Sequence, residues 1–526
     1  MKSFVRRNGI TFLLFILVVV VGVSLVPQIG PAWDEPDNIF SGGQYWNFVK
    51  SGFNQKILSS RDSTTSYFGD VIFTQDPTIA RYPPVPNVIG SVAALIGERL
   101  GFEHTAIHII IEFHIVSVFF FALLVATVFK FGELLGLGVW ESVFAAFICA
   151  LYPTMFGHGL SDLKDAAQVS LFTVSLYLLV KGTLEKIPHD IVLGAIVWGL
   201  ALATKFNAIY VPIIWFLWRI MSCQLDKNKK AYVSFITSLV LILSIGLVTM
   251  FIVWPYLWNQ PIAHVLEVVK YFTTVGQGYR VFWDGVLYQV GVGKSLWWYP
   301  WENLLFETPF LLLLAILIGI AKWILFIFKK NKSACKISLL VIWIVVPLVR
   351  SILPTAAFYD GLRHFMEVLP PLFLLAAFGI SRISSRGIHL FCIVLAIGIL
   401  GHLAFIDSTY FPYSSGYFNM FAVNPNVLFD RDIEALSVHE AVAYVHAAYG
   451  RVRIWVPIGG HLSWYYLTTG DIYVYSATDA DTIVVINKSS HFSQKEFETT
   501  IADTYQLVHT ISRDNAIFAW IYRRKY

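Results

Sequence analysis

Two adjacent carboxylates, Asp34 and Glu35, stand in the stretch GPAWDEPDN at residues 30–38. They follow the first long apolar run of the chain, ITFLLFILVVVVGVSLV, so they lie where a helix would leave a bilayer. Ionisable residues at the ends of membrane helices usually mark functional sites, although such a pair can also be a solvated helix exit. The other ionisable residues of the chain decide between these two interpretations.

Further ionisable residues are predicted on the same membrane face as this pair. They lie in FGHGLSDLKDAAQ (156–168), in PTAAFYDGLRHFMEV (354–368) and at the outer end of one predicted span, and they comprise His158, Asp162, Lys164, Asp165, Lys205, Asp360, Arg363, His364 and Glu367. Cations at a bilayer surface suit a lipid-linked phosphate, whose negative charge grows as it leaves. A carboxylate beside them can take the proton of the incoming nucleophile.

The composition is that of a polytopic membrane protein. Of the 526 residues, 56% are hydrophobic and only 14% are charged, whereas soluble domains carry about 25% charged residues. The net charge is +4 and no long basic run is present, which argues against a nucleic-acid partner. The four cysteines show neither a disulfide framework nor zinc-site spacing.

Apolar runs and Lys/Arg placement predict about eleven transmembrane helices with the N-terminus in the cytoplasm. The predicted spans are 10–28, 106–130, 139–157, 166–182, 190–206, 208–222, 232–254, 305–328, 337–353, 364–381 and 388–406. The first is expected to be an uncleaved signal anchor, because no clean cleavage site follows it. The predicted location is the cell (inner) membrane.

This topology leaves large loops and a tail on the extracytoplasmic side. The predicted transmembrane module covers residues 1–406, with a first loop at 30–105, a second at 157–166 and an aromatic loop at 255–304 whose segments are expected to be interfacial amphipathic helices. Residues 407–526 alternate strand-like runs, such as DTIVVIN, with helical patterns. They predict a small α/β domain, whose place on the reaction face suggests acceptor selection.

These features favour transfer of a sugar from a polyprenyl-phosphate donor to an acceptor hydroxyl. The donor arrives on its lipid, so no nucleotide site is needed, and no Walker or Rossmann loop is present. The acceptor class stays open among protein, lipid and glycan. Whether the transferred group is a hexose or a pentose stays open too.

An ordered set of motifs resembles the GT-C glycosyltransferases. The motifs follow one another in the order seen in the prokaryotic branch of the protein mannosyltransferase and aminoarabinose transferase group. They are WDEP, RYPPVP, FGHGLSDLKDAA, GLALATKFNA, WYPWENLLFETP and FYDGLRHFMEVLPP. The resemblance covers about residues 31–440, and it implies the GT-C fold, a polyprenyl-phosphate sugar donor and inversion at the anomeric carbon. The stretch FDRDIEALSVHEAV before the tail departs from the pattern and leaves acceptor recognition open.

The resemblance also implies roles for single residues. Asp34 matches the catalytic base of the family, with Glu35 beside it, and Asp162 or Asp165 matches a second acidic residue of the site. Arg81 matches a cation that contacts the donor phosphate in some relatives. Further candidates for the phosphate are Lys164, Lys205, Arg363 and His364.

Other interpretations of the same residues stay open. Asp162 and Asp165 can cap a helix, Lys164 can extend to water, and Arg363 can pair only with Asp360 or Glu367. The sequence identifies no certain cofactor, and a divalent cation at Asp34 and Asp162 is possible, since clustered carboxylates with phosphate suit a hard cation. The alternative functions are a secondary transporter, for which no internal repeat is found, and a catalytically inactive scaffold.

Overall fold

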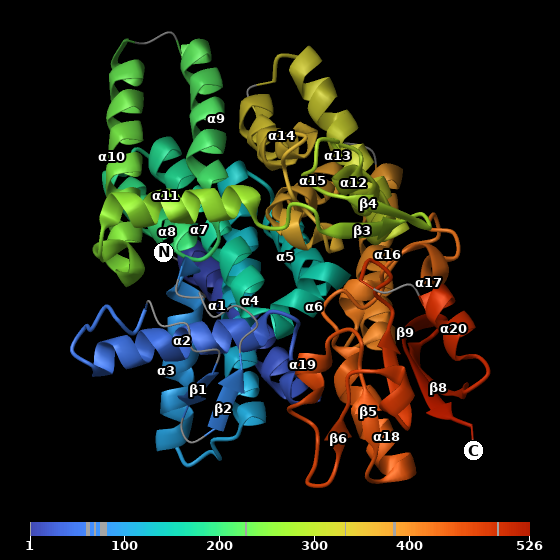
Figure 1. Cartoon of the computed structure of the whole chain (residues 1–526). Coiled ribbons are helices and arrows are strands. Elements are labelled where there is room, and N and C mark those ends of the chain that lie inside the picture. The colour runs from blue at the N-terminus through green and yellow to red at the C-terminus, as the bar shows by residue number, and fades with distance from the viewer. Residues whose placement is uncertain are drawn as a thin grey trace.

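The computed structural model of the chain describes residues 2–58, 64–67, 70–73, 81–226, 229–331, 333–381, 386–491 and 494–525. A helical body comes first, and a smaller domain with a five-stranded sheet follows it (Figure 1). Parts of the predicted first loop (59–63, 68–69 and 74–80) and of the predicted cytoplasmic clusters (227–228 and 382–385) lie outside the described residues.

The chain is a multi-pass membrane protein. Within the described residues, eight helices are long and apolar enough to cross a bilayer, and nine if the bent pair α5 (Val139–Leu151) and α6 (Pro153–Ser161) is one span. The eight spans involve α1 (Lys2–Leu25), α4 (Ala106–Leu135), α7 (Leu163–Leu184), α10 (Lys229–Val253), α13 (Phe310–Phe328), α14 (Ser333–Val349) with η5 (Arg350–Ile352), η6 (Gly361–Val368) with α15 (Leu369–Ile380), and α16 (Arg386–Tyr410).

The predicted number of eleven spans is not confirmed. The predicted spans 190–206 and 208–222 fall on α8 (Pro188–Leu202) and α9 (Tyr210–Asp226), whose apolar helical stretches are shorter than a full span. The helix is interrupted at residues 203–205, and the chain then passes through the 3-10 turn η3 (Phe206–Ile209) before α9 begins. The break lets Lys205 extend its side chain to an aspartate on a neighbouring helix.

The predicted second loop, 157–166, is almost entirely helical. Helix α6 continues to Ser161 after a bend of 62° from α5, and α7 begins at Leu163. Only Asp162 separates them, and its carboxylate accepts a hydrogen bond from the Asp165 backbone N–H at 3.1 Å, which caps α7. The helix-capping interpretation of Asp162 is therefore confirmed.

The aromatic loop 255–304 is only partly helical. It contains η4 (Pro255–Trp258), the amphipathic helix α11 (Pro261–Thr274) and α12 (Tyr299–Glu307), but β3 (Arg280–Trp283) and β4 (Val286–Gln289) form a hairpin between them. The prediction of helices throughout is wrong here, because Asp284 and Gly285 both have positive φ and form the two-residue turn that a hairpin favours. The turn η1 (Val26–Gln28) precedes the predicted first loop, 30–105. That loop contains α2 (Glu35–Lys50), the hairpin of β1 (Thr64–Tyr67) and β2 (Asp70–Phe73), and α3 (Val85–Arg99).

The C-terminal domain is the predicted mixture of helices and strands. Its sheet has the order β6-β5-β7-β9-β8, from β5 (Arg453–Trp455), β6 (Ile472–Tyr473), β7 (Thr482–Ile486), β8 (Tyr505–Arg513) and β9 (Ala516–Arg524). The helical elements of the tail are η7 (Ser414–Gly416), α17 (Pro425–Leu428), α18 (Ser437–Tyr449), α19 (Gly460–Ser463), η8 (Ala477–Asp479) and α20 (Gln494–Ile501). Strand β8 was not predicted, because half of its side chains are polar and its apolar alternation is weak.

The C-terminal domain shares a hydrophobic core with the start of the first loop. Val26, Ile29 and Ala32 are buried in the same cluster as Leu436 and Val438 of the tail. An added Cβ at Gly30 would lie 2.7 Å from Cβ of His439, so α18 packs directly on the backbone of this loop. The tail is therefore fixed against the segment that carries Asp34.

Close packing of α13 on α15 depends on two glycines. An added Cβ at Gly319 would lie 2.1 Å from the Leu375 carbonyl oxygen, and one at Gly379 would lie 2.6 Å from the Ala315 carbonyl oxygen. Small residues at such positions let membrane helices approach closely enough for backbone contact.

We expect Gly319→Ala to destabilise the protein by about 1–3 kcal/mol, because the added methyl group forces the two helices apart. The measurement is the midpoint of thermal unfolding in detergent. Gly401→Ala is the matched control, since a Cβ there meets no atom within 4 Å. Equal midpoints for the two variants would contradict the close contact.

Candidate active site

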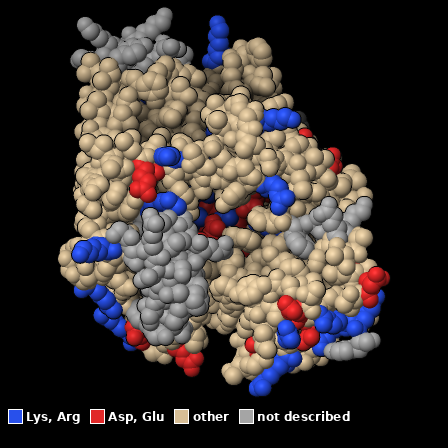
Figure 2. All heavy atoms as spheres, viewed as in Figure 1, with Lys and Arg blue, Asp and Glu red and all other residues tan. Residues whose placement is uncertain are grey.

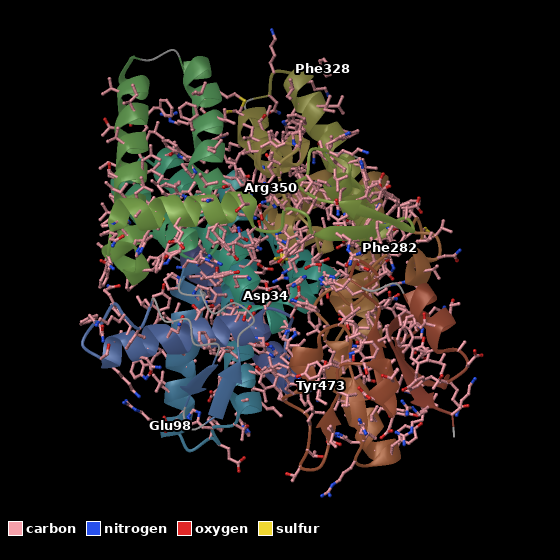
Figure 3. All side chains as sticks on the ribbon, viewed as in Figure 1. Asp34, Glu98, Phe282, Phe328, Arg350 and Tyr473 are labelled. Atoms are coloured by element: carbon pink, nitrogen blue, oxygen red, sulfur yellow. The ribbon has the colours of Figure 1, made fainter. Side chains whose placement is uncertain are left out.

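Asp34 lies near the middle of the molecule, where the helical body meets the C-terminal domain (Figure 3). It immediately precedes α2, and its side chain is 35% exposed. One oxygen, Oδ2, accepts hydrogen bonds from Nζ of Lys164 at 2.9 Å and from the Arg363 guanidinium at 2.6 Å. Asp34 is thus an accessible carboxylate held by two cations.

Arg363 is the centre of the charged cluster and is only 4% exposed. Its nitrogens lie within 4 Å of carboxylate oxygens of Asp34 (2.6 Å), Asp162 (3.2 Å), Asp165 (2.8 Å), Asp360 (3.6 Å) and Glu434 (3.1 Å). All three guanidinium nitrogens take part in these contacts. The predicted pairing with Asp360 is present, but it is the longest of the five.

Backbone contacts fix the segment that carries Arg363. The carbonyl oxygen of His364 accepts a hydrogen bond from the Asn207 side-chain amide at 3.1 Å and a short one from Arg350. Arg350 also donates to the Asn207 side-chain oxygen at 3.0 Å, and the Asn207 amide donates to Glu367 at 3.2 Å. Arg350 and Asn207 were not predicted as site residues, because they lie at the ends of apolar runs.

The other predicted site residues divide between the cluster and its surroundings. Nζ of Lys205 lies 2.6 Å from Asp165 and so joins the cluster. Glu35 instead faces α4, where its carboxylate contacts Nε2 of His114 at 2.9 Å and accepts the Ala32 N–H at 3.1 Å. Glu35 therefore connects the loop to α4 and holds it in place.

Arg81 and His364 contact aromatic rings. The guanidinium of Arg81 lies 4.1 Å from the ring centroid of Tyr271 on α11, and Tyr82 next to it makes a short hydrogen bond with the Tyr271 hydroxyl. The ring of His364 lies 4.4 Å from that of Tyr359. Arg81 is thus positioned by the amphipathic helix α11.

The tail supplies two residues of the cluster that the sequence analysis missed. Glu434 contacts Arg363, and Lys488, which is 2% exposed, contacts Asp360 at 3.1 Å. Glu434 lies in FDRDIEALSVHEAV, the stretch that departs from the resemblance. Only the burial of a charged residue marks these positions, and burial is a property of the folded chain.

The charges in the cluster set the protonation of its carboxyl groups. Burial alone would raise the pKa of Asp34, but Lys164 and Arg363 outweigh it and hold that pKa well below its usual range. Burial, together with Asp165, raises the pKa of Asp162 to about 6 against the effect of Arg363. Burial raises the pKa of Glu434 to about 8, also against Arg363. Asp34 is therefore the ionised, accessible carboxylate of the site.

Three residues of the site form a group that could bind a metal ion. One ligand atom each of His158, Asp162 and Glu434 lies within 4.8 Å of the others, and all three residues are buried. Neither ring nitrogen of His158 has a hydrogen-bond partner among the described residues. An imidazole with two carboxylates is a donor set for Mn²⁺ or Zn²⁺. The sequence suggested a metal ion at Asp34 and Asp162. Asp162 belongs to this group of three, and Asp34 does not.

An apolar cavity of about 620 Å³ lies between α8, η3, α9, α10 and α11. Its walls include Leu202 and Phe206, which stand close to Lys205 in the sequence, and Val268 of α11. Figure 2 shows a hollow near the middle of one face, in which acidic and basic side chains are visible. The site thus combines an apolar cavity with a charged one.

The arrangement of the helices and the C-terminal domain is the fold of the GT-C glycosyltransferases. ArnT from Cupriavidus metallidurans, crystallised with undecaprenyl phosphate, has 12% identity and a TM-score of 0.52, over 98% of both chains. Its apo structure gives 11% identity and a TM-score of 0.50 over 97% of both. The Archaeoglobus fulgidus oligosaccharyltransferase in its apo form has 11% identity and a TM-score of 0.50, over 90% of this chain and 65% of the other.

By sequence, no protein-family model and no curated protein matches the chain. At 11–12% identity, the structural similarity identifies the fold, and the activity has to be argued from the site.

We expect stability to fall less steeply with pH in Glu434→Gln than in the wild type. The pKa of Glu434 is about 8 in the folded protein and about 4.3 in an unfolded chain, so its stabilising contribution is full below about pH 4 and is lost as pH rises toward 8. Glutamine imitates the protonated form and removes this loss. The measurement is unfolding between pH 5 and 8.

Glu440→Gln is the control for this prediction. Hydrogen bonds from Arg513 and Tyr413 lower the pKa of Glu440 against the effect of burial, so its proton is lost below pH 5 in both states. This variant should keep the wild-type slope. An unchanged slope in Glu434→Gln would show that Glu434 is ionised at neutral pH.

Proposed function

We propose that the protein is a membrane glycosyltransferase that moves a sugar from a polyprenyl-phosphate donor to an acceptor hydroxyl. One observation carries the proposal: the accessible, ionised Asp34 is held by Lys164 and Arg363, and Lys205, which contacts Asp165 of the same cluster, is flanked in the sequence by residues of the cavity wall. Support comes from the GT-C fold, which ArnT has with undecaprenyl phosphate bound.

The donor lipid and its phosphate have separate places in this proposal. The apolar cavity takes the part of the isoprenoid chain next to the phosphate, because its walls are almost wholly apolar. The phosphate lies within reach of Arg81, Lys205 and Lys164. Lys164 is 15% exposed, so it is the cation of the Asp34 pair that can turn toward a phosphate.

Asp34 acts as the general base. The acceptor hydroxyl oxygen forms a bond to the anomeric carbon while the bond from that carbon to the phosphate oxygen breaks, which inverts the centre. The phosphate keeps the electron pair of the broken bond, and the proton of the hydroxyl passes to Asp34. When Lys164 turns to the phosphate, Asp34 loses one of the cations that depress its pKa and becomes more basic.

Arg363 holds Asp34 rather than the phosphate. Each of its nitrogens already meets a carboxylate, and it is almost fully buried. This role differs from the phosphate-binding role that the sequence suggested for Arg363. Asp162 and Asp165 hold the Arg363 guanidinium in place through ion pairs. Glu35 keeps the Asp34 loop in place through His114.

The reaction is proposed to take place on the extracytoplasmic side of the cell membrane. The predicted cytoplasmic clusters of Lys and Arg support this orientation. The C-terminal domain, residues 407–526, then also lies outside, next to the site. The acceptor is a hydroxyl of a protein, lipid or glycan.

His158, Asp162 and Glu434 fit a divalent cation, since their ligand atoms converge and His158 has no hydrogen-bond partner among the described residues. A cation held there would add positive charge near the leaving phosphate. Arg363 contacts two of the three ligands, so it competes for the same carboxylates.

We expect the purified, EDTA-treated protein to bind Mn²⁺, and His158→Phe to abolish the binding by removing the only nitrogen ligand of the group. Electron paramagnetic resonance of Mn²⁺ measures the bound ion without a need for activity. His189→Phe, which changes an exposed histidine that contacts Asp190, is the control. Equal binding in the two variants would place any metal elsewhere.

We expect Asp34→Asn to lower transfer by about 100-fold or more, since a base contributes about 10²–10⁴-fold. The assay follows consumption of radiolabelled polyprenyl-phosphate sugars by protein in nanodiscs, with a membrane extract as the source of acceptor. Asp37→Asn, three residues further along α2, is the matched control and should keep its activity.

Full activity of Asp34→Asn would remove Asp34 as the base. If folded wild-type protein consumes no donor of a broad panel, the transporter and scaffold interpretations move ahead of the proposed function.

A further inference from the structure

Trp33, the residue before Asp34, is surrounded by side chains of the C-terminal domain. Nζ of Lys488 lies 4.7 Å from its ring centroid. The rings of His461 and His491 lie 5.2 Å and 5.3 Å from it, and Nε2 of His461 lies 3.1 Å from the Trp33 carbonyl oxygen, to which it donates. The tail thus determines the position of the residue that precedes the proposed base.

The ammonium group of Lys488 has three close partners. Its ammonium group donates to the Ile433 carbonyl oxygen at 2.6 Å, pairs with Asp360 at 3.1 Å and lies over the Trp33 ring. A carbonyl oxygen, a carboxylate and an aromatic ring thus surround the ammonium group. Because it is 2% exposed, Lys488 is not placed to bind a phosphate.

Asp360 gives Lys488 a second connection to Asp34. Its backbone is in the left-handed region, at φ 55° and ψ 50°, which is uncommon for a residue other than glycine. Such a conformation persists where the surroundings hold it. Lys488 and Arg363 both contact the Asp360 carboxylate, and Arg363 in turn donates to Asp34.

We infer that Lys488 is a positioning residue of the transfer reaction, which fixes Asp34 through Trp33 on one side and through Asp360 and Arg363 on the other. This inference rests on the proposed function. It makes the C-terminal domain a structural part of the active site, in addition to any part in acceptor selection. The shared core of Val26, Ile29 and Ala32 with the tail supports it independently.

We expect Lys488→Met to lower kcat about 10- to 100-fold, because a displacement of about 1 Å at a reacting group can reduce the rate by that factor. The KM values for donor and acceptor should stay near those of the wild type, since Lys488 is not placed to touch a substrate. Lys488→Arg retains the positive charge and should recover part of kcat. Thermal unfolding shows whether each variant is folded.

Arg513→Met is the matched control. Arg513 is also a cation of the tail, with contacts to Glu440 at 2.6 Å and to the Phe411 carbonyl oxygen at 3.0 Å, but these connect the sheet to α18 and to the end of α16. Its replacement should reduce stability and leave kcat near the wild-type value. Equal losses of kcat in the two methionine variants would reduce Lys488 to a general stabilising residue.

A double-mutant cycle tests the route through Trp33. If Lys488 acts partly through this ring, Lys488→Met should lower kcat less in a Trp33→Phe background than in the wild type. Fully additive effects would overturn the route through Trp33. A raised KM with unchanged kcat would instead make Lys488 a substrate-binding residue.

The wild-type measurement separates the two proposals. Donor consumption by the wild type together with an unaffected Lys488→Met variant would overturn only the inference on Lys488. Absence of donor consumption in the wild type would overturn the proposed function itself.

Discussion

The contact of one buried guanidinium with five carboxylates is the interaction on which the rest of the site depends. Arg363 brings together the start of α2 (Asp34), the α6–α7 junction (Asp162 and Asp165), the start of its own 3-10 turn (Asp360) and the tail (Glu434). Removing one partner of a buried ion pair leaves an uncompensated charge, which is strongly destabilising. Each of the four segments therefore supplies part of the negative charge that compensates the buried Arg363.

The same arrangement explains why one carboxylate differs from the others. Asp162, Asp165, Asp360 and Glu434 are buried against Arg363, whereas Asp34 is 35% exposed. Lys164 and Arg363 keep it ionised. A site that is organised before the substrate arrives needs little rearrangement during the reaction, which is the main source of electrostatic catalysis. The buried carboxylates thus orient Arg363, and Arg363 orients Asp34.

The apolar cavity and the C-terminal domain extend this charged centre in two directions. Lys205, which is flanked by residues of the cavity wall, contacts Asp165, and Lys488 of the tail contacts Asp360. Each cation thus joins a neighbouring part of the molecule to an aspartate that Arg363 already holds. The fold shared with ArnT at 12% identity shows that this arrangement of helices tolerates extensive change of sequence. Burying a charged side chain is costly unless it is paired, so the buried ion pairs of the site cannot be changed one residue at a time without loss of stability.

The sequence by itself determined the membrane class, most helices and four of the five strands of the tail, because apolar length and alternation are local properties of the chain. It also singled out Asp34 as a candidate for the site. It also brought Asp162, Lys164, Asp165, Lys205 and Arg363 to one membrane face. It did not show that Glu35 turns to His114, that Arg363 is saturated by carboxylates, or that Glu434 and Lys488 complete the cluster. Apart from Asp360, which lies three positions before Arg363, the partners in those contacts are between 71 and 329 positions apart, and only the packing of the folded chain decides which charges are buried together.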